Sequence, residues 1–191
     1  MGNDGRILNT NSRCVALLRG VNVGGRQRVP MADLRALLAG LGAVEVRTLL
    51  NSGNAVFGAA AGAPARSAAK IEGAIRQQLG LDVPVIVKSA QQFAAIVDGN
   101  ALASAVVDPS RLLVVFAPDA PAIESLSVLT LLLAPDERFH LTGHAAYLLC
   151  SAGILQSKAA QALLGKVGRL CTTRNWGTVH KLAGLLGDRQ A

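Results

Sequence analysis

Short apolar runs alternate with longer amphipathic stretches along this chain, and the spacing predicts a protein with both helices and strands. Continuous or alternating apolar residues predict strands. These are 13–18, 44–50, 55–57, 83–87, 112–116, 138–141, 145–150 and 169–172. Apolar residues spaced three and four positions apart predict helices. These are 31–41, 66–79, 91–97, 120–132, 155–164 and 174–186.

The order of these elements is the same in the two halves of the chain. Each half reads β-α-β-β-α-β followed by a helix, which is the order of the ferredoxin-like fold. We therefore expect an α+β protein made of two ferredoxin-like (βαββαβ) subdomains, an apparent structural duplication without residue-level identity. The expected parts are a loose N-terminal tail (1–12), a first half (13–98), a linker (99–110) and a second half (111–188), packed as one compact unit.

A loop rich in glycine and arginine follows the first predicted strand. It contains Arg19, Gly20, Asn22, Gly24, Gly25, Arg26 and Arg28. Glycine permits positive φ and close approach of a ligand to the backbone, while successive N–H groups and arginines attract anions. The loop is neither G-x-G-x-x-G nor a P-loop, because no Gly-Lys-Ser/Thr follows it. It therefore predicts an anion-binding loop without naming a nucleotide.

Further polar residues lie in three other predicted turns or helix starts. They are Asn51, Ser52 and Asn54 in a hairpin, Ser157 and Lys158 at one helix start, and Thr173, Arg174, Asn175 and Trp176 at another. Helix N-termini expose N–H groups that favour anions. Capping of the chain's own helices explains each segment singly, but several such starts together support a binding site.

The positive charge of the chain is concentrated in two windows. The formal net charge is +7, and 11 of the 19 basic residues lie in 5–32 and 138–187, which contain no acid. The rest of the chain has 8 basic against 12 acidic residues. If the two windows meet in the fold, they form one positive region on an acidic body. The alternative is that an arginine- and alanine-rich composition spreads positive charge along the chain without a binding role.

The composition argues against several other classes of protein and of binding site. No apolar run is long enough to span a membrane, and the polar start does not resemble a signal peptide, so we expect a cytoplasmic protein without a membrane partner. Cys14, Cys150 and Cys171 lack metal-binding spacing and are expected as buried, reduced thiols. Aromatic residues are too few to form stacking platforms for single-stranded nucleic acid, although contacts to phosphates through Arg and Lys remain possible.

The sequence contains few candidates for catalytic residues. His140 and His144 lie near Asp136 and Glu137, but a solvated turn explains them better than a metal site. Conceivable nucleophiles are Ser52, Ser157 and Thr173, with Lys158 as an activator. No metal ligand set, cofactor or reaction follows from these residues.

Several motifs together resemble a known family. They are Leu17 to Gly25, Val29-Pro30-Met31 with Leu34 and Leu37-Leu38, Asn51 to Asn54, Ser157-Lys158 and Thr172 to Trp176. The chain beyond residue 12 is similar in these motifs to the bacterial family DUF1697. The resemblance implies an α+β fold with ferredoxin-like parts and supplies no activity. The chain departs from the family pattern at Ser151, Leu155 and Gly177.

We therefore expect a phosphate-bearing or other small anionic ligand where the glycine-rich loop meets the two helix starts of the second half. Arg19, Lys158 and Arg174 would hold charge, Asn22 and Asn54 would orient the ligand, and Gly20, Gly24 and Gly25 would shape the loop. The alternatives are a nucleic-acid-binding protein with a broad basic face and an enzyme of unknown reaction.

Overall fold

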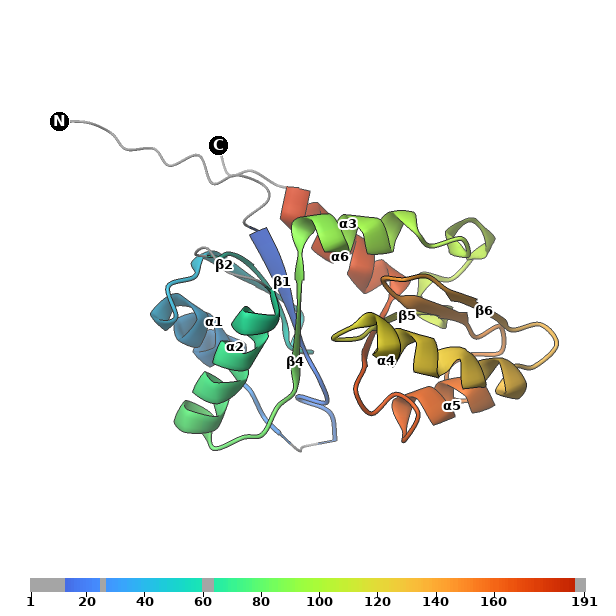
Figure 1. Ribbon diagram of the computed structural model, residues 1–191, viewed down its shortest axis with the longest axis horizontal. Coiled ribbons are helices and arrows are strands. Elements are labelled where there is room, and N and C mark those ends of the chain that lie inside the picture. Colours follow the sequence, from blue (N-terminus) through green and yellow to red (C-terminus); the bar gives the residue numbers. More distant parts are fainter. Residues whose placement is uncertain (1–12, 25–26, 60–63, 188–191) are drawn as a thin grey trace.

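A computed structural model describes residues 13–24, 27–59 and 64–187 (Figure 1). The predicted tail, 1–12, and the site residue Gly25 lie outside the described residues. The first half contains β1 (Arg13–Leu18), α1 (Met31–Gly40), β2 (Val44–Leu49), β3 (Asn54–Gly58), α2 (Pro64–Leu79), β4 (Val85–Ser89) and α3 (Ala90–Asp98). The second contains β5 (Leu112–Phe116), α4 (Ala120–Glu124), the 3₁₀ helix η4 (Ser125–Leu132), β6 (Arg138–Leu141), β7 (Ala146–Leu149), α5 (Lys158–Leu164), β8 (Thr172–Asn175) and α6 (Trp176–Gly187).

Two four-stranded antiparallel sheets form the framework of the molecule. Their strand orders are β2-β3-β1-β4 and β6-β7-β5-β8, so each half places its elements at equivalent positions in its own sheet. The predicted α+β class is thus confirmed, with two similar subdomains. The segment between them, 99–110, contains two short 3₁₀ helices, η2 (Ala103–Ala105) and η3 (Pro109–Arg111, which extends one residue further).

The helices and sheets form successive layers (Figure 1). Helices α1 and α2 cover one face of the first sheet, and α4, η4 and α5 cover one face of the second. Helices α3 and α6 lie between the two halves and contact each other. A central apolar cluster joins them to Val15 and Leu17 of β1 and to Val114 and Phe116 of β5. The two halves therefore share a core, which holds them as one unit.

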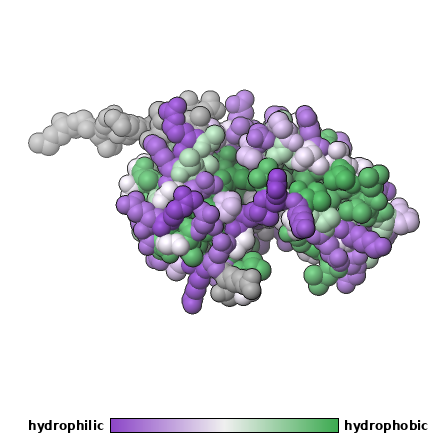
Figure 2. All heavy atoms as spheres, turned by 60° about the horizontal axis from the view of Figure 1, so that its bottom comes forward, coloured by the Kyte–Doolittle hydropathy of each residue, from purple (hydrophilic) through white to green (hydrophobic). Residues whose placement is uncertain are grey.

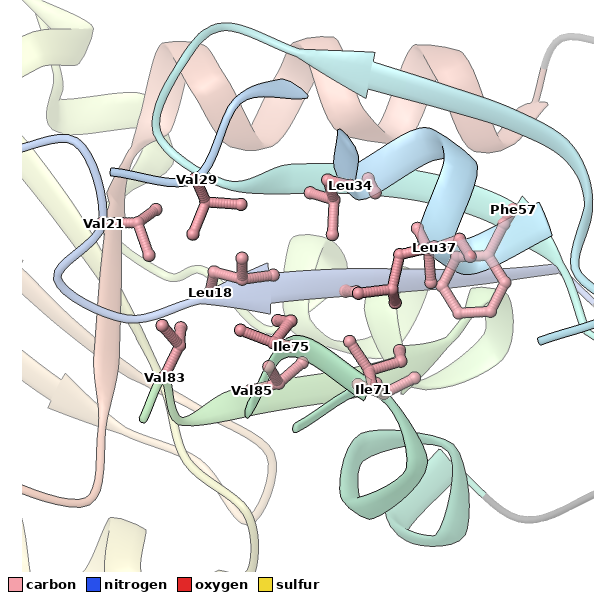
Figure 3. Close-up of a cluster of buried hydrophobic side chains, with 14 of the residues drawn as sticks. Leu18, Val21, Val29, Leu34, Leu37, Phe57, Ile71, Ile75, Val83 and Val85 are labelled. Atoms are coloured by element: carbon pink, nitrogen blue, oxygen red, sulfur yellow. The ribbon is translucent and has the colours of Figure 1, made fainter. Parts of the chain in front are cut away.

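Strand β1 is buried along its whole length because both of its faces are covered. Ala16 and Leu18 pack in the cluster under α1 and α2, whereas Val15 and Leu17 pack in the central cluster. A strand covered on both faces reads as a continuous apolar run, which is why its bounds could be predicted from the sequence. Figure 3 shows Leu18 among the side chains of the cluster under α1 and α2.

The end of the chain differs from the sequence prediction. The last strand was expected at 169–172 and the last helix from Arg174, but β8 spans Thr172–Asn175 and α6 starts at Trp176. Asn175 Oδ1 accepts a hydrogen bond from the Thr178 N–H at 2.9 Å and so caps α6. The prediction was wrong because a polar strand that pairs with a buried strand resembles a helix cap in sequence.

Two other helices are shorter than predicted. The helix expected over 120–132 is α-helical only to Glu124 and continues as 3₁₀. Within it the hydroxyls of Ser125 and Thr130 donate to carbonyls three residues earlier, a competition that weakens α-helix. The helix expected from Leu155 starts at Lys158, capped by Ser157. No helix in the described part of the chain combines the length and apolar character needed to cross a membrane.

Tyr147 couples the second sheet to the central layer. Its hydroxyl, in a side chain with no solvent exposure, donates to the Ile96 carbonyl of α3 at 2.6 Å. We predict that Tyr147→Phe lowers the free energy of unfolding by about 1–3 kcal/mol, because a buried carbonyl loses its donor. Urea denaturation measures this. Thr130→Val, which removes an exposed hydroxyl bonded to the Ser127 carbonyl, is the control and should cost less than about 0.5 kcal/mol. Equal losses would contradict the role of Tyr147.

The buried thiol of Cys150 makes stability depend on alkaline pH. Burial raises its pKa from 9.0 to about 11, so the folded chain keeps this proton after the unfolded chain has lost it. The stabilisation is therefore complete below about pH 9 and is lost as pH rises toward about 11, a decrease of about 2–3 kcal/mol. We predict that Cys150→Ala loses less stability than wild type over this range by about this amount, whereas the contributions of the other buried thiols, Cys14 and Cys171, remain. Denaturation of both proteins across this range tests it, and parallel curves would refute it.

Candidate functional site

A cleft of about 720 Å³ lies between the two halves. One wall comes from the end of β1 and the loop after it, with Ser52 and the entry to β4. The other comes from the end of α5 and from β8. Figure 2 views the molecule from the side where a notch separates the two lobes. The lining residues are Leu18, Arg19, Gly20, Val21, Val23, Gln27, Ser52, Asp82, Pro84, Leu163, Leu164, Gly168, Cys171, Thr172, Thr173 and Arg174.

The loop after β1 is closed by its own hydrogen bonds and anchored in the core. Asn22, at φ +57°, donates from Nδ2 to the carbonyls of Val29 and Asn51, and its Oδ1 accepts from the Val29 N–H at 3.0 Å. Val21 and Val29 are buried beside Leu18, as Figure 3 shows. The Asn22 side chain is thus committed to holding the loop.

Two glycines of this loop have backbone angles that favour glycine. Gly20 has φ +66° and Gly24 has φ +60°. A Cβ on Gly20 would meet only Gln27 Oε1, at 3.7 Å, so conformation rather than space requires glycine there. Gly20 lines the cleft, whereas Gly24 does not.

Arg19 brings the two basic windows together. Its Nη1 donates to the backbone carbonyl of Arg169 in the second half. A second contact joins the windows at the far end of β1, where Arg13 Nη1 donates to the Leu186 carbonyl at 3.0 Å. The windows therefore meet in the fold. Arg13 is buried, however, so this contact adds no charge to the surface.

Arg174 is buried under the cleft, with its guanidinium bonded to the first half. Nη2 donates to the carbonyls of Leu18 at 2.8 Å and Ser52 at 3.1 Å, and Nε donates to Asn54 Oδ1. Nη1 donates within β8, to Thr172 Oγ1 at 2.9 Å and the Thr173 carbonyl at 2.7 Å. The five N–H groups of the guanidinium all have protein acceptors.

The charge of Arg174 is not balanced by an acid. Burial lowers its pKa to about 10, so the guanidinium remains charged at neutral pH. Its acceptors are carbonyl, amide and hydroxyl oxygens, and no carboxylate of the described residues forms an ion pair with it. A buried positive charge surrounded by neutral dipoles projects a positive potential into the neighbouring cleft.

The hairpin between β2 and β3 acts as the support for this arginine. Asn54 has no solvent exposure and donates to the Leu49 carbonyl at 3.0 Å and to Ser52 Oγ at 2.9 Å. Asn51 contributes its backbone carbonyl to Asn22. At Gly53, φ is +73° and a Cβ would lie 2.6 Å from the Leu18 Cβ, so only glycine fits against β1. Asn54 thus positions Arg174, the Asn51 carbonyl positions Asn22, and of these hairpin residues only Ser52 lines the cleft.

The second-half residues predicted for the site are separated by the fold. Thr173 and Arg174 line the cleft, but Ser157 and Lys158 do not. The cleft is lined by Leu163 and Leu164 at the other end of α5, about 9 Å along the helix axis from Lys158. Ser157 Oγ accepts from the Ala160 N–H at 3.0 Å, as expected of a cap.

Asn175 and Trp176 also point elsewhere. Asn175 caps α6, and neither residue lines the cleft. Trp176 is buried in the central cluster, with its ring at 4.5 Å from that of His180 in an edge-to-face arrangement. Both residues therefore support the layer behind the site.

Among the lining residues that were not predicted as site residues, four have polar or thiol side chains: Gln27, Asp82, Cys171 and Thr172. Gln27 Nε2 donates to the Asp82 carbonyl at 3.0 Å, which links the loop to the entry of β4. The Asp82 carboxylate forms an ion pair with Arg76. Burial raises the pKa of Cys171, which keeps the thiol protonated, although Arg19 partly opposes this. Only the polar strand Thr172–Asn175 carried a signal that could have suggested Thr172.

The described residues contain no cluster of His, Cys, Asp and Glu that could hold a metal ion. The His140 ring stacks on Tyr147, with centroids 5.9 Å apart, and the His144 N–H donates to Thr142 Oγ1 in the turn. These histidines thus serve the β6–β7 hairpin rather than a common centre.

Comparison with known proteins identifies relatives without a described activity. The sequence profile of a family described as "Protein of unknown function (DUF1697)" matches residues 12–147. A solved structure described as "The structure of conserved bacterial protein SP0830 from Streptococcus pneumoniae" is similar, with a TM-score of 0.76 and 25% identity. The match covers 91% of this chain and 98% of that one. The comparison with curated proteins gave no match.

Arg174 should matter for stability whatever the cleft binds. We predict that Arg174→Met lowers the free energy of unfolding by about 3 kcal/mol or more, because Leu18, Ser52 and Asn54 lose buried donors. The matched control is Arg169→Met, whose side chain is exposed, with an expected change below about 0.5 kcal/mol. Denaturant unfolding of the two variants measures the difference. A loss at Arg174 no greater than at Arg169 would contradict this role.

Proposed function

Because the chain belongs to the DUF1697 family, whose description assigns no function, we propose a function from the cleft: the protein binds a phosphate-bearing or other small anionic ligand between its halves. One observation carries this proposal. The buried charge of Arg174, with neutral acceptors only, lies beside Arg19 in a cleft that is also lined by the glycine-containing loop. A bound anion would supply the missing negative charge.

The described residues have different parts in this proposal. Arg19 contacts the ligand, because it is partly exposed in the cleft and uses one Nη1 hydrogen for the Arg169 carbonyl. The Thr173 hydroxyl and the backbone N–H of Gly20 are further donors on the two walls. Arg174 acts through its potential, since its N–H groups are already used. A cleft of about 720 Å³ falls in the size range of sites for cofactor-sized ligands.

We also assign each half to the ferredoxin-like class. Read from the other edge, the first sheet has the order β4-β1-β3-β2, and the second sheet has the equivalent order, with a β-α-β-β-α-β connection in each half. In this assignment the two halves are duplicated units, and the ligand lies between them. A cytoplasmic site of action fits such a ligand.

The burial of arginines favours a small ligand over nucleic acid. Arg13 and Arg174 belong to the two basic windows, but both are buried and donate to carbonyl groups. They cannot contact a phosphate backbone without giving up these bonds. A broad basic face therefore loses two of its members, whereas a single anion in the cleft still benefits from the Arg174 charge.

Catalysis has less support than binding. The cleft thiol, Cys171, has a raised pKa, and the cleft carboxylate, Asp82, is paired with Arg76. Neither arrangement activates a nucleophile or provides a free general base. We therefore propose binding as the function and assign no reaction.

The test is calorimetric titration with inorganic pyrophosphate and with ADP, on wild type and Arg19→Gln. We expect wild type to bind and Arg19→Gln to bind about tenfold more weakly, because a charge-assisted contact is lost. Lys181→Gln, an exposed change on α6 with the same loss of charge, should bind like wild type.

Salt separates this proposal from a nucleic-acid-binding protein. Small-anion binding should weaken modestly with salt, whereas an oligonucleotide held by many arginines would show a steep dependence. Absence of binding to both probes, or equal weakening in Arg19→Gln and Lys181→Gln, would overturn the proposed function.

A further inference from the structure

Lys88 occupies a position where the fold expects an apolar side chain. It lies on β4 opposite Val15, and the alternation of a strand places it on the same face as Ile86. That face packs in the central cluster between the halves. Lys88 is only 8% exposed, while the other lysines of the chain, Lys70, Lys158, Lys166 and Lys181, are all exposed. A buried lysine at a core position is costly, which suggests a function.

A second, smaller pocket of about 130 Å³ opens at this lysine. It lies between the halves and shares no lining residue with the larger cleft. β4 and α3 form one side, and the start of α4 and the β6–β7 turn form the other. The lining residues are Lys88, Gln92, Ile96, Pro118, Asp119, Ala120, Ile123, Gly143 and His144.

The polar neighbours of Lys88 are engaged elsewhere. Asp119 Oδ1 accepts from the Ala122 N–H at 2.9 Å and caps α4, and Gln92 Oε1 accepts from the Ser89 N–H at 3.0 Å. Over 13–24, 27–59 and 64–187, no residue forms a hydrogen bond or ion pair with Lys88 Nζ. The side chain is therefore largely buried, while the amine at its end has no direct partner among the described residues and opens to the pocket.

Charge and burial together determine the protonation of this amine. Burial lowers the pKa of Lys88, and the negative charge of Asp119 partly opposes that shift. His144 on the β6–β7 turn is the other titratable group that lines the pocket. The unprotonated, nucleophilic amine is therefore present at a higher fraction than in an exposed lysine at the same pH.

We propose that Lys88 is a carbonyl-reactive amine that forms an imine with a small, uncharged aldehyde in the pocket between β4, α3 and the α4 start. The Nζ lone pair attacks the carbonyl carbon, and the carbonyl π electrons move to oxygen, which takes up a proton. Loss of a proton from nitrogen and of water from carbon then gives the C=N bond. Amine and aldehyde together yield imine and water, without an oxidant or reductant.

The size and charge of the pocket define the aldehyde. A cavity of about 150 Å³ is known to hold benzene, so a pocket of about 130 Å³ suits a molecule of up to about six non-hydrogen atoms. The Asp119 carboxylate on the wall disfavours a substrate that carries its own carboxylate. His144 also lines the pocket and can exchange protons with the carbinolamine. This inference is independent of anion binding in the larger cleft.

A simpler role for Lys88 is attraction to Asp119 across the two halves. The two roles differ in the effect of Asp119→Asn, because asparagine preserves the helix cap while removing the charge. Without that charge the pKa of Lys88 falls further, so imine formation at neutral pH should accelerate. A purely structural pair predicts lower stability and no gain in reactivity.

The experiment is labelling of the folded protein with a low concentration of propionaldehyde, trapped with cyanoborohydride at neutral pH and mapped by peptide mass spectrometry. The four exposed lysines are internal controls, and labelling in urea normalises the intrinsic reactivity of every site. We expect Lys88 to carry at least about fivefold more label than the mean of the other four, and Asp119→Asn to increase this at least about twofold. Lys88→Arg should lose only this label.

Several outcomes would overturn the proposal. These are Lys88 labelling at or below the level of the exposed lysines, or no increase in Asp119→Asn when circular dichroism shows it folded. Equal labelling of Lys88 by pyruvate and propionaldehyde would refute the preference for an uncharged carbonyl compound. Failure of pyrophosphate binding in the larger cleft would leave these results unaffected, because neither readout depends on that cleft.

Discussion

The buried guanidinium of Arg174 is the interaction on which the arrangement of the two halves depends most. It extends from β8 of the second half and donates to Leu18, Ser52 and Asn54 of the first. The acceptors are the Leu18 carbonyl at the end of β1 and, in the hairpin between β2 and β3, the Ser52 carbonyl and Asn54 Oδ1. A planar fork of donors is needed to reach them all at once, and lysine could not replace it. The same charge lines the cleft and has no acidic partner among the described residues.

The loop after β1 and the hairpin between β2 and β3 form the first-half wall of that cleft. Asn22 ties the loop to the Asn51 carbonyl, and Gly53 lets the hairpin approach Leu18 closely. These contacts place Gly20 and Arg19 at the cleft. Ordering this wall around a ligand would cost little, because the loop is already closed by its own hydrogen bonds.

A second largely buried charged residue, Lys88, lies in the central layer. Helices α3 and α6 join both sheets through an apolar cluster, and Lys88 enters this layer from β4. Apolar residues would stabilise the layer more, since a buried amine loses hydration. The small pocket, with Asp119 and His144 from the second half, is where that loss is compensated in part. Arg174 and Lys88 therefore both lie where the two halves face each other. Figure 2 shows that apolar side chains gather instead over the second half, where Leu131, Leu155, Leu164 and Leu170 are exposed.

Local pattern was enough to predict most of the elements. The apolar run at 13–18 and the helix expected over 91–97 appear in the structure as β1 and α3, because burial on both faces and helical spacing of apolar residues are local signals. The order of elements likewise predicted two similar α+β halves. The strand Thr172–Asn175 was misread because its polar side chains pair with residues more than a hundred positions away.

The sequence by itself determined the class of the fold, the glycine- and arginine-rich loop and the two basic windows. Only the tertiary structure decided that the two basic windows meet and that Ser157 and Lys158 lie at the end of α5 away from the cleft. It also decided that the N–H groups of Arg174 donate to carbonyl groups of the first half. It alone revealed Lys88 as a largely buried lysine whose amine borders a pocket. The physical reason is that charge and polarity are visible in a sequence, whereas burial and hydrogen-bond partners depend on contacts between distant segments.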